Sequence, residues 1–139
     1  MIAPPILTCV SSFLYIAISP KKGRGVFTAS HIGEGEVIEV CPVLLFNNSE
    51  DVQHIEATPL ADYYYRWNDE TNALVLGYGC LYNHSYKPNA YYRRNYAEQT
   101  MEFIALRDIR EGEEILINYN GDPYCMDPLW FSGVEESSS

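Results

Sequence analysis

Residues 82–89 have the sequence YNHSYKPN, which directly follows a short apolar stretch. A polar turn with Asx-type hydrogen bonds is the simplest interpretation, because Asn, Ser and Pro are common turn residues. The number of different donor and acceptor groups within residues 83–89 instead favours a loop that binds or positions something.

Two other segments add to this pattern. Residues 22–27 read KGRGVF, and two glycines around one residue allow a ligand to approach the backbone closely. A hairpin turn explains them as well, and a dinucleotide fingerprint is excluded because neither a third glycine nor a helix follows. Residues 113–119 read EEILINY, an apolar stretch ending on a Tyr that packing alone could explain.

Short apolar segments separated by Gly, Pro and Asn predict a mostly β domain with little helix. Strands are expected over residues 13–18, 25–29, 36–45, 73–77, 90–96, 101–106 and 115–119. Segments 90–96 and 101–106 should pair with each other. One short helix is expected within residues 48–55, capped by Asn48 or Ser49, whereas residues 59–67 are ambiguous.

The length of 139 residues fits one domain. We expect this domain to occupy residues 13–131, after a lead-in at 1–12 and before a disordered acidic, Ser-rich tail at 132–139. The first eighteen residues carry no charge. They are not expected to be a signal peptide, because no basic region precedes them and Pro4 and Pro5 interrupt the apolar run.

Together and in this order, the three segments resemble the SET-domain family of protein lysine methyltransferases. Members have a glycine turn, an Asn-His-Ser segment ending in Pro-Asn, and a closing Glu-Glu-apolar-Tyr strand. The resemblance extends over residues 14–130 and is closest in architecture to the minimal viral SET histone methyltransferase. It implies a mostly β SET (β-clip) fold of several small sheets with short helices. It also implies a C-terminal pseudo-knot between the Asn-His-Ser segment and the last strand.

The resemblance further implies S-adenosylmethionine as cofactor and S-adenosylhomocysteine as product. Tyr119 would be the catalytic residue at the methyl-transfer centre. The cofactor-binding residues would be Lys22, Gly23, Arg24, Gly25, Asn83 and His84. No metal ligand is expected.

The chain has twelve Tyr residues, and a lysine channel would give part of this excess a use. The substrate-channel residues would be Tyr63, Tyr92, Ile117, Tyr124 and Trp130. For the four aromatic ones, plain packing is as good an explanation. Ile117 stands where many members carry an aromatic residue, which predicts room for more than one methyl group unless Tyr92 fills the space.

Acidic residues outnumber basic ones, 19 to 9, for a formal charge of −10. This balance argues against direct binding to nucleic acid and suits a basic protein or peptide as substrate, although solubility alone could explain it. The four Cys lack zinc-site spacing and are expected to be free buried thiols of an intracellular protein, cytoplasmic or nuclear in a eukaryotic host. No membrane span is expected. The viral resemblance suggests a homodimer.

Two other functions compete with a lysine methyltransferase acting on a histone-like protein. A binding module could retain the SET fold without turnover. A carbohydrate-binding β module could use exposed Tyr for stacking, but it leaves residues 83–89 and 113–119 unexplained.

Overall fold

The structure is a computed structural model that describes residues 13–20 and 23–129. The expected lead-in 1–12, Lys22, Trp130 and the expected tail 132–139 lie outside the described residues. Short strands dominate the described chain. The elements are β1 Leu14–Ser19, β2 Gly23–Thr28, β3 Val37–Asn47, α1 Glu50–Glu56, the 3-10 helix η1 Pro59–Asp62, β4 Tyr65–Arg66, β5 Thr71–Val75, β6 Asn83–His84, β7 Ala90–Asn95, β8 Thr100–Ala105 and β9 Leu116–Ile117.

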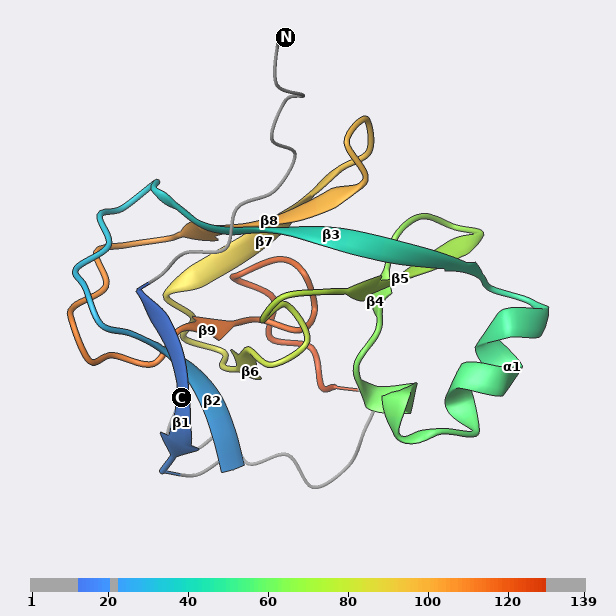
Figure 1. Ribbon diagram of the computed structural model, residues 1–139, viewed down its shortest axis with the longest axis horizontal. Coiled ribbons are helices and arrows are strands. Elements are labelled where there is room, and N and C mark those ends of the chain that lie inside the picture. The colour runs from blue at the N-terminus through green and yellow to red at the C-terminus, as the bar shows by residue number, and fades with distance from the viewer. Residues whose placement is uncertain (1–12, 21–22, 130–139) are drawn as a thin grey trace, which may run out of the picture.

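The strands form three small sheets (Figure 1). β1 and β2 make an antiparallel hairpin, and β6 and β9 make a short parallel pair. The other strands form a five-stranded antiparallel sheet in the order β4-β5-β3-β8-β7. Figure 1 shows β3 as the long strand of this sheet, with α1 following at its far end. The expectation of a mostly β fold of several small sheets is confirmed.

The five-stranded sheet brings side chains from its two edge strands, β4 and β7, into contact. The two neighbours of β3 use different parts of it, since residues 37–42 pair with β8 and residues 43–47 pair with β5. At the edges, Arg94 Nε on β7 donates to the carbonyl of Arg66 on β4 at 2.7 Å. The rings of Tyr65 and Tyr92 meet edge to face with centroids 5.0 Å apart. Side chains rather than strand pairing therefore join the two edges.

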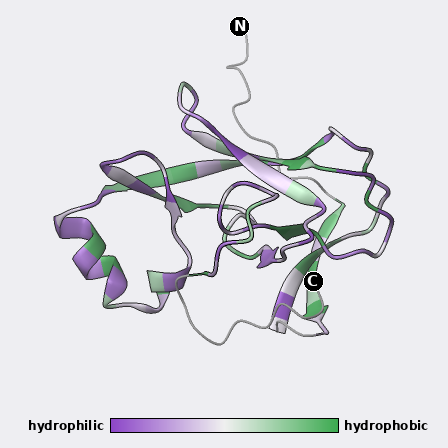
Figure 2. Ribbon diagram, turned by 180° about the vertical axis from the view of Figure 1, so that it is seen from behind, coloured by the Kyte–Doolittle hydropathy of each residue, from purple (hydrophilic) through white to green (hydrophobic). Residues whose placement is uncertain are grey.

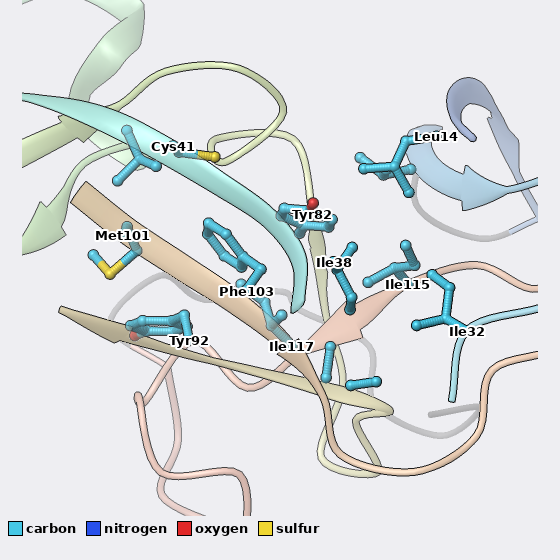
Figure 3. Close-up of a cluster of buried hydrophobic side chains, with 14 of the residues drawn as sticks. Leu14, Ile32, Ile38, Cys41, Tyr82, Tyr92, Met101, Phe103, Ile115 and Ile117 are labelled. Carbon is cyan, nitrogen blue, oxygen red and sulfur yellow. The ribbon is translucent and has the colours of Figure 1, made fainter. Parts of the chain in front are cut away.

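The hydrophobic core unites strands from all three sheets. Met101 and Phe103 on β8, Ile117 on β9 and Val26 on β2 are fully buried. Figure 3 shows Met101 and Phe103 near Tyr92, with Ile117 close to Phe103. Figure 2 shows hydrophobic residues concentrated along the strands, whereas the connecting loops are mostly polar. Burial of these apolar side chains is the main favourable contribution to folding.

A carboxyl group is buried in this core. Glu39 on β3 is only 1% exposed. Its Oε1 accepts the Tyr82 hydroxyl at 2.6 Å, and its Oε2 accepts the Tyr78 N–H at 3.0 Å. Burying a carboxyl group is costly, and these two hydrogen bonds offset part of that cost. Because both donors lie just before β6, Glu39 fixes the approach of the chain to that strand.

The parallel pair of β6 and β9 is held by Asn89 as well as by its own backbone. Asn89 Nδ2 donates to the carbonyl of Glu114 at 2.8 Å, and its Oδ1 accepts the N–H of Leu116 at 2.8 Å. The Ser85 N–H donates to the carbonyl of Ile117 at 2.8 Å. The buried Asn89 side chain thus pairs with the backbone as a neighbouring strand would. The expected association of the Asn-His-Ser segment with the last strand is present.

Most expected strands are confirmed to within a few residues, including the pairing of β7 with β8. The expected cap position at Ser49 is confirmed, whereas the expectation for the thiols needs correction. Ser49 is the N-cap of α1, but its side chain makes no capping bond, and Asn47 Oδ1 instead accepts the N–H groups of Ser49 and Asp51 at 3.1 Å. Of the thiols expected to be buried, Cys41 is buried, whereas Cys80 and Cys125 are partly exposed.

The ambiguous residues 59–67 form η1 and β4. No helix in the described part of the chain is long and apolar enough to cross a membrane.

Replacing Tyr82 with Phe should lower the free energy of unfolding by about 1–3 kcal/mol, because the buried Glu39 carboxyl loses a hydrogen-bond donor. Urea denaturation followed by circular dichroism measures this change. Tyr91→Phe, on the opposite face of β7 from Tyr92, is the control and should change the free energy by less than about 0.5 kcal/mol. Equal stability of Tyr82→Phe and wild type would contradict the role given to Glu39.

Candidate active site

The glycine turn, the Asn-His-Ser segment and the Glu-Glu strand meet in space. Asn83 Nδ2 donates to the carbonyl of Arg24 at 2.9 Å and to Oε2 of Glu114 at 2.7 Å. Glu114 Oε1 accepts the Ser19 hydroxyl at 2.7 Å. A single amide and a single carboxylate therefore join three segments that are far apart in the sequence.

Gly25 is the residue that allows this junction. A Cβ at position 25 would overlap Glu114 Oε2 and lie 2.9 Å from Asn83 Nδ2. Two groups crowd the same point, so a side chain could be accommodated only by moving the carboxylate and the amide together. Gly23 differs, because it has a φ of +74° and nothing within 4 Å of its Cβ position. The backbone at Gly23 is therefore open to a ligand.

His84 holds the backbone of Tyr119. The imidazole is 3% exposed, and its Nδ1 accepts the N–H of Tyr119 at 2.9 Å. An imidazole nitrogen that accepts a hydrogen bond carries no proton, so this contact favours neutral His84. The His84 ring also packs against the rings of Tyr86 and Tyr119, with centroids 4.6 and 5.1 Å apart. His84 thus contacts both the backbone and the ring of Tyr119.

The Tyr119 hydroxyl lies beside the carbonyl of Tyr82, the residue before Asn83. It donates to that carbonyl at 2.6 Å. Both residues also line a cavity of about 510 Å³. The half-buried Tyr119 therefore connects the Asn83–His84 segment with this cavity.

Tyrosine dominates the cavity wall. The lining includes Tyr63, Tyr64, Tyr65, Tyr82, Tyr92 and Tyr119, together with the charged residues Glu56, Asp62, Arg66 and Arg94. Burial raises the pKa values of Tyr65, Tyr82 and Tyr92. Burial and the hydrogen bond to Glu56 raise the pKa of Tyr64 to about 12. These hydroxyls stay protonated near neutral pH and add no negative charge to the cavity.

The structure brings together most of the residues singled out from the sequence. Gly23, Arg24, Gly25, Asn83 and His84 lie around one junction, and Tyr63, Tyr92 and Tyr119 line the cavity. Ile117 is 0% exposed in the core, and Tyr124 is 75% exposed. Neither of these two belongs to the cavity lining. Lys22 and Trp130 lie outside the described residues.

Sequence reasoning missed several residues that contribute to the site. Glu114 was visible in the motif at 113–119, but its contact with Asn83 depends on tertiary structure. Tyr64 and Tyr65 follow Tyr63 directly, so a run of three Tyr was an available signal. Tyr82 begins the motif at 82–89, but its contact with Tyr119 depends on tertiary structure. No local pattern marks Arg94, whose position depends on the sheet.

Comparison with known proteins gives one consistent result. The SET domain model matches residues 23–120. The chain belongs to the SET domain family. It is 35% identical over 130 residues to a histone-lysine N-methyltransferase of Schizosaccharomyces pombe that is specific for lysine 37 of histone H3. That alignment covers 94% of this chain and 84% of the relative.

A solved structure supports the same conclusion. It is a candidate histone methyltransferase of Plasmodium falciparum, with a TM-score of 0.64 and 35% sequence identity. The alignment covers 79% of this chain and 95% of that structure. The SET fold expected from the sequence is therefore confirmed.

Membership of the SET family implies S-adenosylmethionine as the methyl donor. The residues at the glycine turn suit the methionine end of that molecule, which carries an ammonium and a carboxylate. Glu114 and Asn83 present a carboxylate and an amide beside the carbonyl of Arg24, all of which can accept an ammonium. The open backbone at Gly23 leaves room beside them.

Replacing Gly25 with Ala should weaken binding of S-adenosylhomocysteine by at least about tenfold, because the new methyl group displaces Glu114 and Asn83. Isothermal titration calorimetry measures the affinity, and thermal unfolding checks that the variant is folded. Glu111→Gln is the control, because it removes an exposed acidic side chain three residues before Glu114. Unchanged affinity of folded Gly25→Ala would contradict a cofactor site at this turn.

Proposed function

We propose that this chain is a protein-lysine N-methyltransferase that transfers a methyl group from S-adenosylmethionine to the ε-amine of a lysine on a basic, histone-like protein. The observation that carries the proposal is the position of Tyr119. Its backbone is bonded to His84 and its hydroxyl to the Tyr82 carbonyl, and its ring lines the tyrosine-rich cavity. One residue thus touches both the cofactor-binding segment and the cavity for the lysine.

A histone-like substrate is supported by the relatives and by charge. The Schizosaccharomyces pombe relative is specific for a lysine of histone H3. The formal charge of −10 on this chain attracts basic proteins and accelerates their encounter with it. An intracellular location, cytoplasmic or nuclear, would accompany such a substrate. Formation of a homodimer stays a prediction.

The glycine turn and the Asn83–His84 segment are the proposed cofactor site. Gly23, Arg24 and Gly25, with Lys22 before them, would bind the methionine end through their backbone, and Asn83 and His84 would border the bound molecule. When bound, S-adenosylmethionine supplies an electrophilic methyl group on a positively charged sulfur. The chain must then align the lysine nitrogen with that methyl group, which is mainly a problem of orientation.

The cavity prepares the lysine for attack. Only the neutral amine is nucleophilic, and a free lysine ammonium has a pKa of about 10.4. A cavity of protonated Tyr side chains removes water from the ammonium and so disfavours the charged form. Tyr rings also attract the cation during entry, and their hydroxyls can bond to the amine.

Two neighbouring oxygen atoms are proposed to border the path of the methyl group. The Tyr119 hydroxyl oxygen and the Tyr82 carbonyl oxygen are 2.6 Å apart, and both residues line the cavity. Oxygen acceptors of this kind hold a polarised methyl group through weak C–H···O contacts. Tyr63 and Tyr92 are proposed as channel residues. Channel roles for Ile117, Tyr124 and Trp130 stay predictions.

Tyr119→Phe should reduce kcat by roughly 100-fold, because it removes the hydroxyl that orients the amine and the methyl group. The assay follows transfer of labelled methyl groups to a panel of basic proteins and then maps the modified residue. Tyr91→Phe is the matched control. Undiminished transfer by Tyr119→Phe would contradict the proposal, and cofactor binding without any transfer by wild type would favour a non-catalytic binding module.

Tyr92→Phe should shift the products toward more highly methylated lysine. Tyr92 lines the cavity, and Ile117, which has no hydroxyl, is buried behind it in the core. Removing the Tyr92 hydroxyl frees space and a hydrogen-bonding group beside the amine. Mass spectrometry of a methylated peptide measures the ratio of mono-, di- and trimethyl products. A purely monomethyl product from both wild type and Tyr92→Phe would contradict this prediction.

A further inference from the structure

A cation is fixed in the wall of the cavity that is proposed to receive another cation. Arg94 on β7 is half-buried and lines the cavity. Its Nε donates to the carbonyl of Arg66 at 2.7 Å, and its guanidinium carbon lies 5.7 Å from the centroid of the Tyr92 ring. These contacts hold the guanidinium in place from two strands.

The charge of Arg94 is not neutralised by a carboxylate within the described residues. The neighbouring Arg66 pairs with Asp69 at 3.1 Å, and Arg93 pairs with Glu102 at 2.6 Å. Arg93 and Arg94 are adjacent on one strand and therefore point to opposite faces of the sheet. Glu102 therefore pairs with Arg93 on one face of the sheet, whereas Arg94 lies on the other face and lines the cavity.

Other ionisable groups also face the cavity. They are Glu56 from α1, Asp62 from η1, Tyr63 and Tyr64 after it, Tyr65 and Arg66 from β4, Cys80 and Tyr82 before β6, Tyr92 from β7, and Tyr119. Glu56 and Asp62 are exposed, so water and salt screen their charges. Burial raises the pKa values of Cys80 and of Tyr65, Tyr82 and Tyr92, so these groups stay neutral. Of the charged residues that line the cavity, Arg94 is therefore the half-buried one, whereas Glu56, Asp62 and Arg66 are exposed.

We infer that Arg94 assists catalysis by electrostatic repulsion: its guanidinium disfavours the ammonium form of the substrate lysine in the cavity and so increases the fraction of neutral, nucleophilic amine. This inference rests on the proposed function. Arg94 is a positioning and electrostatic residue here, because it acts through the field in the cavity and not on the reacting atoms.

The expected size of the effect follows from Coulomb's law. At an effective dielectric constant of about 20–40, a positive charge in the cavity wall lowers the pKa of a nearby ammonium by roughly half to one unit. The sign is definite, because a neighbouring positive charge lowers the pKa of an ammonium. Glu56 and Asp62 act in the opposite direction at the rim, where attraction of the incoming lysine favours its entry.

The test is the pH dependence of kcat with a lysine peptide whose neighbouring residues are uncharged. The rising limb of kcat between about pH 6 and pH 10 reports deprotonation in the enzyme–substrate complex. Arg94→Gln should move this limb to higher pH by roughly half to one unit. Arg94→Met retains the stem over Tyr92 and should give the same shift. Arg94→Lys retains the charge and should leave the limb at the wild-type position.

Arg93→Gln is the control on the opposite face and should leave the limb unchanged. A lower kcat or higher KM for Arg94→Gln with no displacement of the limb would overturn the inference, since a structural role or a contact with an acidic substrate residue gives that result. The same shift in Arg94→Lys as in Arg94→Gln would overturn it as well. Failure of the proposed function is distinguishable, because wild type would then methylate no lysine at any pH.

Discussion

The parallel pairing of β6 with β9 is the constraint on which the site depends. This pair is only two residues long on each side, so its own backbone bonds are few. Asn89 extends it with two side-chain bonds to the backbone, and the imidazole of His84 accepts the N–H of Tyr119 just beyond it. His84, a residue of the pair itself, therefore positions Tyr119, and Asn89 supports the same pair. A substitution that weakens the β6–β9 pair is therefore also expected to displace Tyr119.

The curled five-stranded sheet supplies the other half of the site. Its edge strands β4 and β7 contribute Tyr65 and Tyr92, whose rings meet where the edges approach each other. Flexible charged side chains alone would not keep a cavity narrow, whereas packed aromatic rings have few conformations. Half of the twelve Tyr residues line the cavity, where they form a rigid wall with protonated hydroxyl groups. This arrangement disfavours a charged amine and suits a reaction that needs a neutral one.

Charge is distributed differently outside and inside the molecule. The net charge of −10 makes the surface attractive to basic proteins over long distances. The cavity is lined by Tyr side chains and the half-buried guanidinium of Arg94, together with the exposed residues Glu56, Asp62 and Arg66. In the proposed function, a basic substrate would be attracted to the protein by the exposed acids and would meet a less favourable environment for its ammonium in the cavity. In this proposal, exposed acidic side chains promote binding of the lysine, whereas the Tyr and Arg94 side chains of the cavity promote its deprotonation.

The sequence by itself determined the mostly β fold, the SET family and the central roles expected for Asn83, His84 and Tyr119, because these depend on local motifs and on alternating hydrophobicity. It did not reveal β6, since two residues are too few for a periodic pattern. It could not locate Tyr82 or Arg94 at the site, nor separate Ile117 and Tyr124 from the residues that line the cavity. Those positions depend on the meeting of β4 with β7 and of β6 with β9. Contacts between strands far apart in the chain leave no local signal, and only the tertiary structure decides them.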